Sequence, residues 1–293
     1  MSGTLGYLAY RIFSGVFGVL PEPVVRRLGW GLGYLVSFVA RERFRMAVRH
    51  QRRALGGSGD PRRSARRAFA LYGRYWAETF WLRPRRRREI LARTDIVNIG
   101  YLHDAVASER GLILALPHMG NWEVAGLRGA AEGARVLAVA EQLPNERIVD
   151  WFTKQRAMMD IDIVIARRGV TQALRERLTA GGTVALLSDR DLKGRGIPVV
   201  LFGEATTMPA GPIALALQTG ATVLPVGTYF RRGAGHTFVV SPPLEIPEAG
   251  TDGERVRLGT QRLAGVLEEI IRAAPEQWHL VQPNWPSDRE EPA

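Results

Sequence analysis

From residue 96 onward, short apolar runs alternate with stretches whose apolar residues recur every three or four positions. The short runs predict β-strands, and the periodic stretches predict amphipathic helices. Strands are expected at residues 97–100, 112–116, 136–140, 163–165, 183–187, 223–228 and 238–240. Helices are expected after Asn121 and at residues 145–159, 170–180, 209–219 and 253–274. This alternation is typical of an α/β fold with a mostly parallel central sheet and flanking helices.

The first part of the chain, residues 1–95, shows helical periodicity and forms a helical N-terminal region. Residues 5–20 and 28–40 are apolar and rich in glycine and aromatic residues, and the second run is 13 residues long. A helix needs about 20 apolar residues to span a bilayer, so we expect two helices that lie on a membrane surface. The alternative is that these helices cover the core. Residues 96–293 form the α/β core, continuous with the N-terminal region in one domain.

A third helix is expected at residues 64–82, where aromatic side chains recur at three- or four-residue intervals. Such a stripe is typical of core packing.

The net charge is +11, and almost all of the basic residues are arginine, since Lys154 and Lys193 are the only lysines. Arginine binds phosphate in a bidentate manner, so the charge predicts an anionic lipid partner; a basic surface without a binding role is the alternative. The chain has no zinc-ligand spacing, helix-turn-helix pattern or aromatic RNA platform, so nucleic acid is not expected as a partner. It has no cysteine, which excludes disulfides and thiolate metal sites, and we expect no metal.

Residues 111–123 carry the pattern that most directly indicates chemistry. An apolar strand leads to His118, and Glu123 follows five positions later at the start of a helix. Open α/β sheets bind ligands at such strand ends, and an imidazole beside a carboxylate can take a proton from a hydroxyl. A buried structural histidine and an acid that favours the helix dipole are the alternatives. Asn121 is expected to cap the helix or to contact substrate, and backbone N–H groups of the turn would suit an oxyanion.

The string Leu116-Pro-His-Met-Gly-Asn-Trp-Glu123 resembles the histidine–acid motif of the lysophospholipid acyltransferase superfamily. Within that superfamily it is most similar to the bacterial branch that acylates lipid A and phosphatidylinositol mannosides. Further strings follow in the order typical of the branch: Ser188-Asp-Arg-Asp-Leu192, Phe202-Gly-Glu204, Met208-Pro-Ala-Gly-Pro212, Gln218-Thr-Gly220 and Pro275-Glu-Gln-Trp-His279. The segment from Trp278 to Trp285 looks most like the actinobacterial phosphatidylinositol mannoside acyltransferases.

The resemblance implies a catalytic group of His118, Glu123 and Asp189. His118 is the general base, and Glu123 orients its imidazole and stabilises the imidazolium. Asp189 is a second acidic partner of the histidine, at a position where many relatives have glutamate.

The expected substrate-binding residues are Asn121, Arg156, Arg190, Gly211 and Arg168, of which the resemblance implies Arg156 and Arg190. The arginines are expected to bind phosphate or carbonyl oxygens. Gly211 is expected to let a phosphate approach the start of a helix. A surface role is the alternative for Arg156.

These observations predict a peripheral O-acyltransferase at the cytoplasmic face of the cell membrane. It would move a palmitoyl group from acyl-CoA, a co-substrate, to a hydroxyl of a phosphatidylinositol mannoside, with no bound cofactor. A lipid A lauroyl- or myristoyltransferase that uses acyl carrier protein is the near alternative. A hydrolase is disfavoured because the chain has no Gly-x-Ser-x-Gly motif and no metal-binding group near His118, and the intact motif disfavours a non-catalytic lipid-binding protein.

Overall fold

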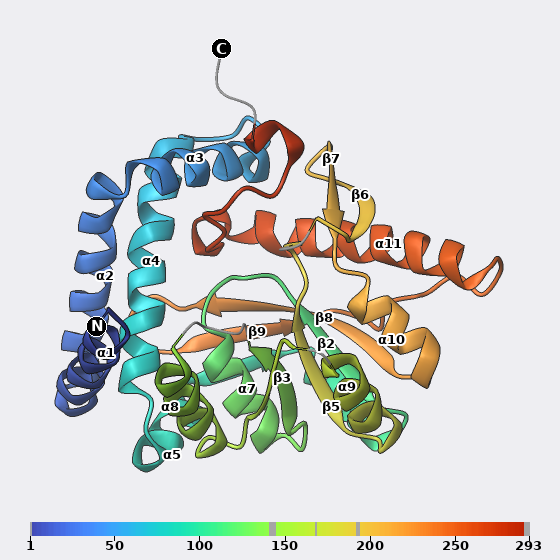
Figure 1. The fold of residues 1–293 in the computed structure, drawn as a ribbon, viewed down its shortest axis with the longest axis horizontal. Coiled ribbons are helices and arrows are strands. Elements are labelled where there is room, and N and C mark those ends of the chain that lie inside the picture. Colours follow the sequence, from blue (N-terminus) through green and yellow to red (C-terminus); the bar gives the residue numbers. More distant parts are fainter. Residues whose placement is uncertain (1, 141–144, 168, 192–193, 290–293) are drawn as a thin grey trace.

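The computed structural model describes residues 2–140, 145–167, 169–191 and 194–289. A central sheet lies between two layers of helices, and a group of long N-terminal helices packs along one side (Figure 1). The sheet has seven strands in the order β1-β9-β8-β2-β5-β3-β4. Their bounds are β1 Thr94–Val97, β2 Leu112–Leu116, β3 Val136–Ala140, β4 Asp162–Ile165, β5 Thr183–Leu187, β8 Thr222–Phe230 and β9 His236–Val240. All neighbours pair in parallel except β8 and β9, so the expected mostly parallel sheet is confirmed.

The helices of the α/β part lie on both faces of the sheet. Their bounds are α6 Ile99–Ala107, α7 Trp122–Ala131, α8 Glu146–Ala157, α9 Val170–Thr179, α10 Gly211–Thr219 and α11 Asp252–Ala273. Alternate residues of β2 face opposite layers, as the two-residue period of a strand requires. Ile113 belongs to the hydrophobic cluster that includes α9, α10 and α11, whereas Leu112 belongs to the cluster that includes α6 and α7. Figure 1 shows α11 and α7 on opposite sides of the sheet.

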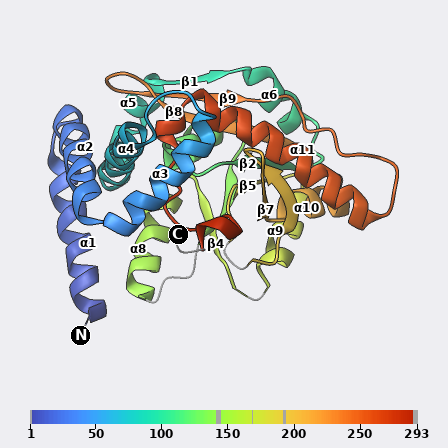
Figure 2. The same cartoon turned by 90° about the horizontal axis from the view of Figure 1, so that it is seen from above.

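The N-terminal helices are α1 Ser2–Val19, α2 Glu22–Val39, α3 Arg41–Leu55, α4 Pro61–Trp81 and α5 Arg87–Ala92. Both views place α1, α2 and α4 side by side (Figures 1 and 2). Helices α2 and α4 cross with their backbones in contact, because a Cβ at Gly33 would lie 2.2 Å from the carbonyl oxygen of Phe69. A Cβ at Gly73 would lie equally close, at 2.2 Å, to the carbonyl oxygen of Gly29. Within the described residues, no helix is both long and apolar enough to cross a membrane.

One sequence-based expectation about the strands was wrong, and one pair of strands was not predicted. The strand expected at residues 97–100 lies at Thr94–Val97, because Asn98 has a positive φ of 59° and α6 begins at the next residue. The antiparallel hairpin of β6 (Ile197–Leu201) and β7 (Glu204–Met208) was not expected, since its sequence lacks a clear alternation of apolar and polar residues.

Candidate active site

His118 and Asp189 meet because of the register between two parallel strands. Leu116 at the end of β2 is paired with Leu187 at the end of β5, and each of the two polar residues lies two positions beyond its strand. Nδ1 of His118 is 2.6 Å from Oδ1 of Asp189. The backbone N–H of His118 donates to Oδ2 of the same carboxylate, at 3.1 Å. The carboxyl ends of neighbouring parallel strands thus bring an imidazole and an acid together.

The carboxylate of Asp189 is fully buried and held from several sides. The indole Nε1–H of Trp278 donates to Oδ2 of the carboxylate at 2.7 Å. The side-chain amide of Asn284 donates to the backbone oxygen of Asp189 at 3.1 Å. Burial alone would raise the pKa of Asp189, but the imidazole and the hydrogen bonds outweigh burial and leave the pKa below its usual value. An ionised Asp189 accepts the Nδ1–H of His118, so Nε2 of the neutral ring carries the lone pair.

The turn that carries His118 is fixed by the C-terminal segment. The N–H of Gly120 donates to the oxygen of Gln277 at 3.0 Å, and the N–H of His279 donates to the oxygen of His118 at 2.7 Å. Gly120 has a φ of 56°, and a Cβ there would lie 2.0 Å from the oxygen of Thr228, so only glycine fits. The expectation that backbone N–H groups of this turn bind an oxyanion is wrong for His118 and Gly120, since both N–H groups already donate within the protein.

Glu123 contacts Arg156. The guanidinium donates from Nε to Oε2 at 2.8 Å and from a terminal nitrogen to Oε1 at 2.5 Å, and the hydroxyl of Tyr75 donates to Oε1 at 3.3 Å. Burial lowers the pKa of Arg156, but Glu123 more than compensates and raises it above its ordinary value. The expectation that Glu123 orients the imidazole is therefore wrong, because both of its oxygens bind Arg156 and the contact to His118 comes from Asp189.

Asn121 is a structural residue of the helix start. Its side-chain oxygen accepts the N–H of Val124 at 3.3 Å, and its amide donates to Oε2 of Glu78 at 2.9 Å. The side chain is fully buried, so the expected cap is confirmed and the alternative of a substrate contact is wrong.

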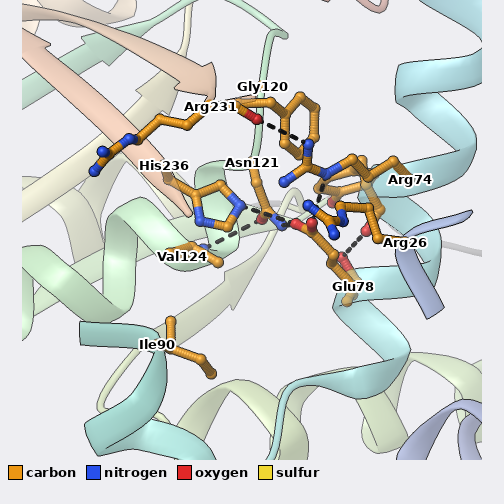
Figure 3. A network of polar contacts seen from close by, with 12 residues as sticks. Arg26, Arg74, Glu78, Ile90, Gly120, Asn121, Val124, Arg231 and His236 are labelled. Atoms are coloured by element: carbon orange, nitrogen blue, oxygen red, sulfur yellow. Dashed lines mark hydrogen bonds and ion pairs between the residues drawn. The ribbon is translucent and has the colours of Figure 1, made fainter. Parts of the chain in front are cut away.

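Glu78 on α4 links the catalytic turn to two more buried groups (Figure 3). Nε of Arg74 donates to its Oε1 at 2.6 Å, and Nε2 of His236 lies 2.9 Å from its Oε2. Burial would raise the pKa of Glu78, but His236 and Arg74 bring it down to about 2. Glu78 was not predicted as a site residue, although an acid within the aromatic face of residues 64–82 was a detectable signal.

The side chain of His118 lines a cavity of about 600 Å³. Glu123, Arg156 and Arg190 also line it, so the structure brings these predicted site residues together with His118. The rest of the lining is mainly apolar and comes from the strands, α4, α7–α9 and the C-terminal segment, including Leu114, Leu116, Val136, Ala138, Ile163, Ile165, Leu187, Val226 and Phe238. A few polar groups in the wall of a mainly apolar cavity are suited to a lipid substrate.

Among the predicted binding residues that the structure describes, Asn121 and Gly211 do not line this cavity. Gly211 begins α10 and is absent from the cavity lining, and a Cβ there would make only an ordinary contact with Leu186, at 3.9 Å. Gly211 does lie at the start of a helix, as expected, and its contact with phosphate stays a prediction. Arg168 lies outside the described residues.

Comparison with known proteins identifies the family. The family model of the bacterial lipid A biosynthesis acyltransferases matches residues 2–287. The chain belongs to this family. It is therefore an acyltransferase of lipid synthesis that acts on glycolipids.

Relatives from actinobacteria and from an enteric bacterium match much of the chain. A phosphatidylinositol mannoside acyltransferase of Mycolicibacterium smegmatis is 36% identical over 76% of this chain and 72% of its own length. The enzyme of that name from Mycobacterium tuberculosis is 36% identical over 75% of this chain and 69% of its own length. A lipid A biosynthesis lauroyltransferase of Escherichia coli is 26% identical over 88% of this chain and 84% of its own length.

Proposed function

We propose that this acyltransferase moves a palmitoyl group from acyl-CoA to a hydroxyl of a phosphatidylinositol mannoside, with His118 as the general base. The observation that carries the proposal is the pair of His118 and Asp189, of which His118 lines a mainly apolar cavity. The acceptor is inferred from the relatives, since those at 36% identity are phosphatidylinositol mannoside acyltransferases.

In the proposed reaction, Nε2 of His118 takes the proton of the acceptor hydroxyl as its oxygen attacks the thioester carbonyl. Asp189, hydrogen-bonded to Nδ1 at 2.6 Å, stabilises the imidazolium that forms. The tetrahedral intermediate then collapses, the carbon–sulfur bond breaks, and the coenzyme A thiolate takes the proton from Nε2. The products are the new ester and coenzyme A, and His118 returns to its neutral form.

The cavity and its arginines support the assignment of the two substrates. Its volume of about 600 Å³ is typical of ligand sites, and its apolar lining suits the acyl chain of the donor. Arg156 and Arg190 line the same cavity and would bind phosphate or the developing oxyanion.

We also propose that the protein binds peripherally to the cytoplasmic face of the membrane. Helix α1 and the end of α2 expose apolar side chains, among them Ile12, Val16, Val19, Phe38 and Val39. The arginine-rich helix α3 follows directly. Apolar insertion and attraction to anionic headgroups are the two contributions that peripheral binding requires.

The test is mass spectrometry of products from the purified protein. Palmitoyl-CoA is offered with phosphatidylinositol mannoside, and acyl carrier protein thioesters are offered with the lipid A precursor. We expect the mannoside to gain one palmitoyl group and His118→Ala to abolish the gain while the protein remains folded. Acylation of the lipid A precursor alone would favour the lauroyltransferase alternative, release of free fatty acid alone would indicate a hydrolase, and no reaction would indicate a binding protein.

A further inference from the structure

A second cavity, here called the side cavity, lies between α1, α2 and α4. Its volume is about 330 Å³. Its lining is almost entirely apolar and includes Phe13, Leu32, Val36, Phe69, Phe80 and Val281. The glycines of the close crossing between α2 and α4 also border it, so the missing side chains leave space beside the crossing.

Only one layer of side chains separates the side cavity from the catalytic cavity. Tyr72 and Trp76 on α4 line both cavities. In the C-terminal segment, Leu280 and Gln282 line the catalytic cavity, whereas Val281 between them lines the side cavity. The two cavities therefore lie on opposite sides of a shared wall.

The rim of the side cavity combines a positive charge with exposed apolar groups. Arg43 is the one charged residue in its lining, among the residues that the structure describes, and it is exposed. Leu32 and Val36 line the cavity but remain 49% and 45% exposed, so the cavity continues into the surface of α2. An apolar cavity with a cation at its edge is complementary to a lipid whose phosphate lies next to its acyl chains.

We propose that the side cavity binds one acyl tail of the anionic glycolipid acceptor, with the lipid phosphate at Arg43. This inference rests on the proposed function, since it takes the acceptor to be a phosphatidylinositol mannoside. The reaction brings two lipids together, and the cavity at His118 accommodates the chain of the donor. A separate site for an acceptor tail holds the acceptor in place while its sugar hydroxyl reaches the imidazole.

The first test fills the side cavity. Leu32→Trp with Val36→Trp places two indoles at the lining, and Leu28→Trp with Leu35→Trp makes a similar change on α2 at residues outside the lining, which are 45% and 61% exposed. We expect the first pair to raise KM for the diacylated acceptor about tenfold, the effect of roughly two methylene groups left in water. KM for the deacylated, water-soluble headgroup should not change, and the control pair should change neither value. Equal effects on both acceptors, or no effect on either, would overturn the proposal.

The second test measures binding without transfer, so it separates this proposal from the proposed function. Phosphatidylinositol with a photoreactive diazirine in one tail is irradiated with the full-length protein, and the labelled peptides are mapped. We expect labels on residues 69–80 of α4 and on Leu32 and Val36, and we expect the double tryptophan variant to lose them. Labels confined to Leu28 and Leu35 of α2 and to Ile12 and Val16 of α1, which are exposed and outside the lining, would mean that the tail contacts only the outer surface, and the side cavity would not be its site. Labelling as expected in a protein that fails to acylate the mannoside would contradict the proposed function alone.

Discussion

The acid that contacts the imidazole of His118 is Asp189, 71 residues away along the chain and 2.6 Å away in space. Glu123, five residues away in sequence, binds Arg156 on α8. The pair of His118 and Asp189 joins the ends of two strands, whereas the pair of Glu123 and Arg156 joins two helices at the wall of the cavity. The two acids that the sequence assigned to one role therefore have different roles.

Asp189→Asn should lower kcat by about 10²–10⁴, with a smaller change in KM. An asparagine can donate to Nδ1, which favours the wrong tautomer, and it cannot stabilise the imidazolium. Steady-state kinetics with the mannoside acceptor measure both constants, and circular dichroism checks the fold. A change in KM alone would make Asp189 a substrate ligand.

Glu123→Ala and Arg156→Ala should show non-additive effects on kcat/KM, with a coupling of about 0.5–3 kcal/mol. The reason is that Glu123, which is 5% exposed, holds the guanidinium by two hydrogen bonds. The double-mutant cycle measures the coupling, and the cycle of Glu123→Ala with Arg190→Ala is the comparison. Additive losses for Glu123 and Arg156 would show that the ion pair has no part in catalysis.

Glu78→Gln should lower the free energy of unfolding by about 3–5 kcal/mol, because the buried guanidinium of Arg74 loses its ionised partner. Arg74 and Glu78 are 5% and 3% exposed. Urea denaturation measures the change, and adding Arg74→Met to Glu78→Gln should recover part of it. A double variant less stable than Glu78→Gln would show that the charge on Arg74 is satisfied without Glu78.

Stability should fall as the pH drops below about 6.5, and His279 should account for part of the fall. Burial lowers the pKa of His279 from 6.5 to about 3, against the opposing effect of its hydrogen bond to Gly120. The folded state keeps this ring neutral while the unfolded state binds a proton, so its contribution is complete above pH 6.5 and is lost as the pH falls from 6.5 toward 3. The slope from this one group is at most about 1.4 kcal/mol per pH unit.

Urea denaturation between pH 7.5 and 5 checks this prediction, with His279→Gln as the test variant. The exposed His103, changed to Gln, is the control and should retain the slope of the wild type. An unchanged slope in His279→Gln would assign the acid sensitivity to other groups.

The protein should sediment with vesicles that contain anionic lipid, and high salt should weaken this binding without abolishing it. The attraction of each basic residue near the surface contributes about 1 kcal/mol, while the apolar contribution does not depend on salt. Removal of the first forty residues should release the protein from the vesicles. Equal binding to neutral vesicles would exclude the electrostatic contribution, and undiminished binding of the truncated protein would exclude insertion of α1 and α2.

The sequence by itself determined the local elements and the nature of the chemistry. The side-chain periods of a strand (two residues) and of a helix (3.6 residues) are set by the backbone alone. The main strands and helices α8, α9 and α11 were therefore predicted within a few residues. The apolar strand that leads to His118 is also a local sequence pattern, and it identified His118 as the central residue of the site.

Only the tertiary structure decided which groups meet. The pairing of β2 with β5 brings Asp189 to His118, and strand order and register arise from packing that no local pattern encodes. Glu78 reaches Asn121 only because α4 docks on the catalytic turn. The side cavity depends on the angle at which α2 crosses α4, since the volume between two helices is set by their packing and not by the sequence of either one.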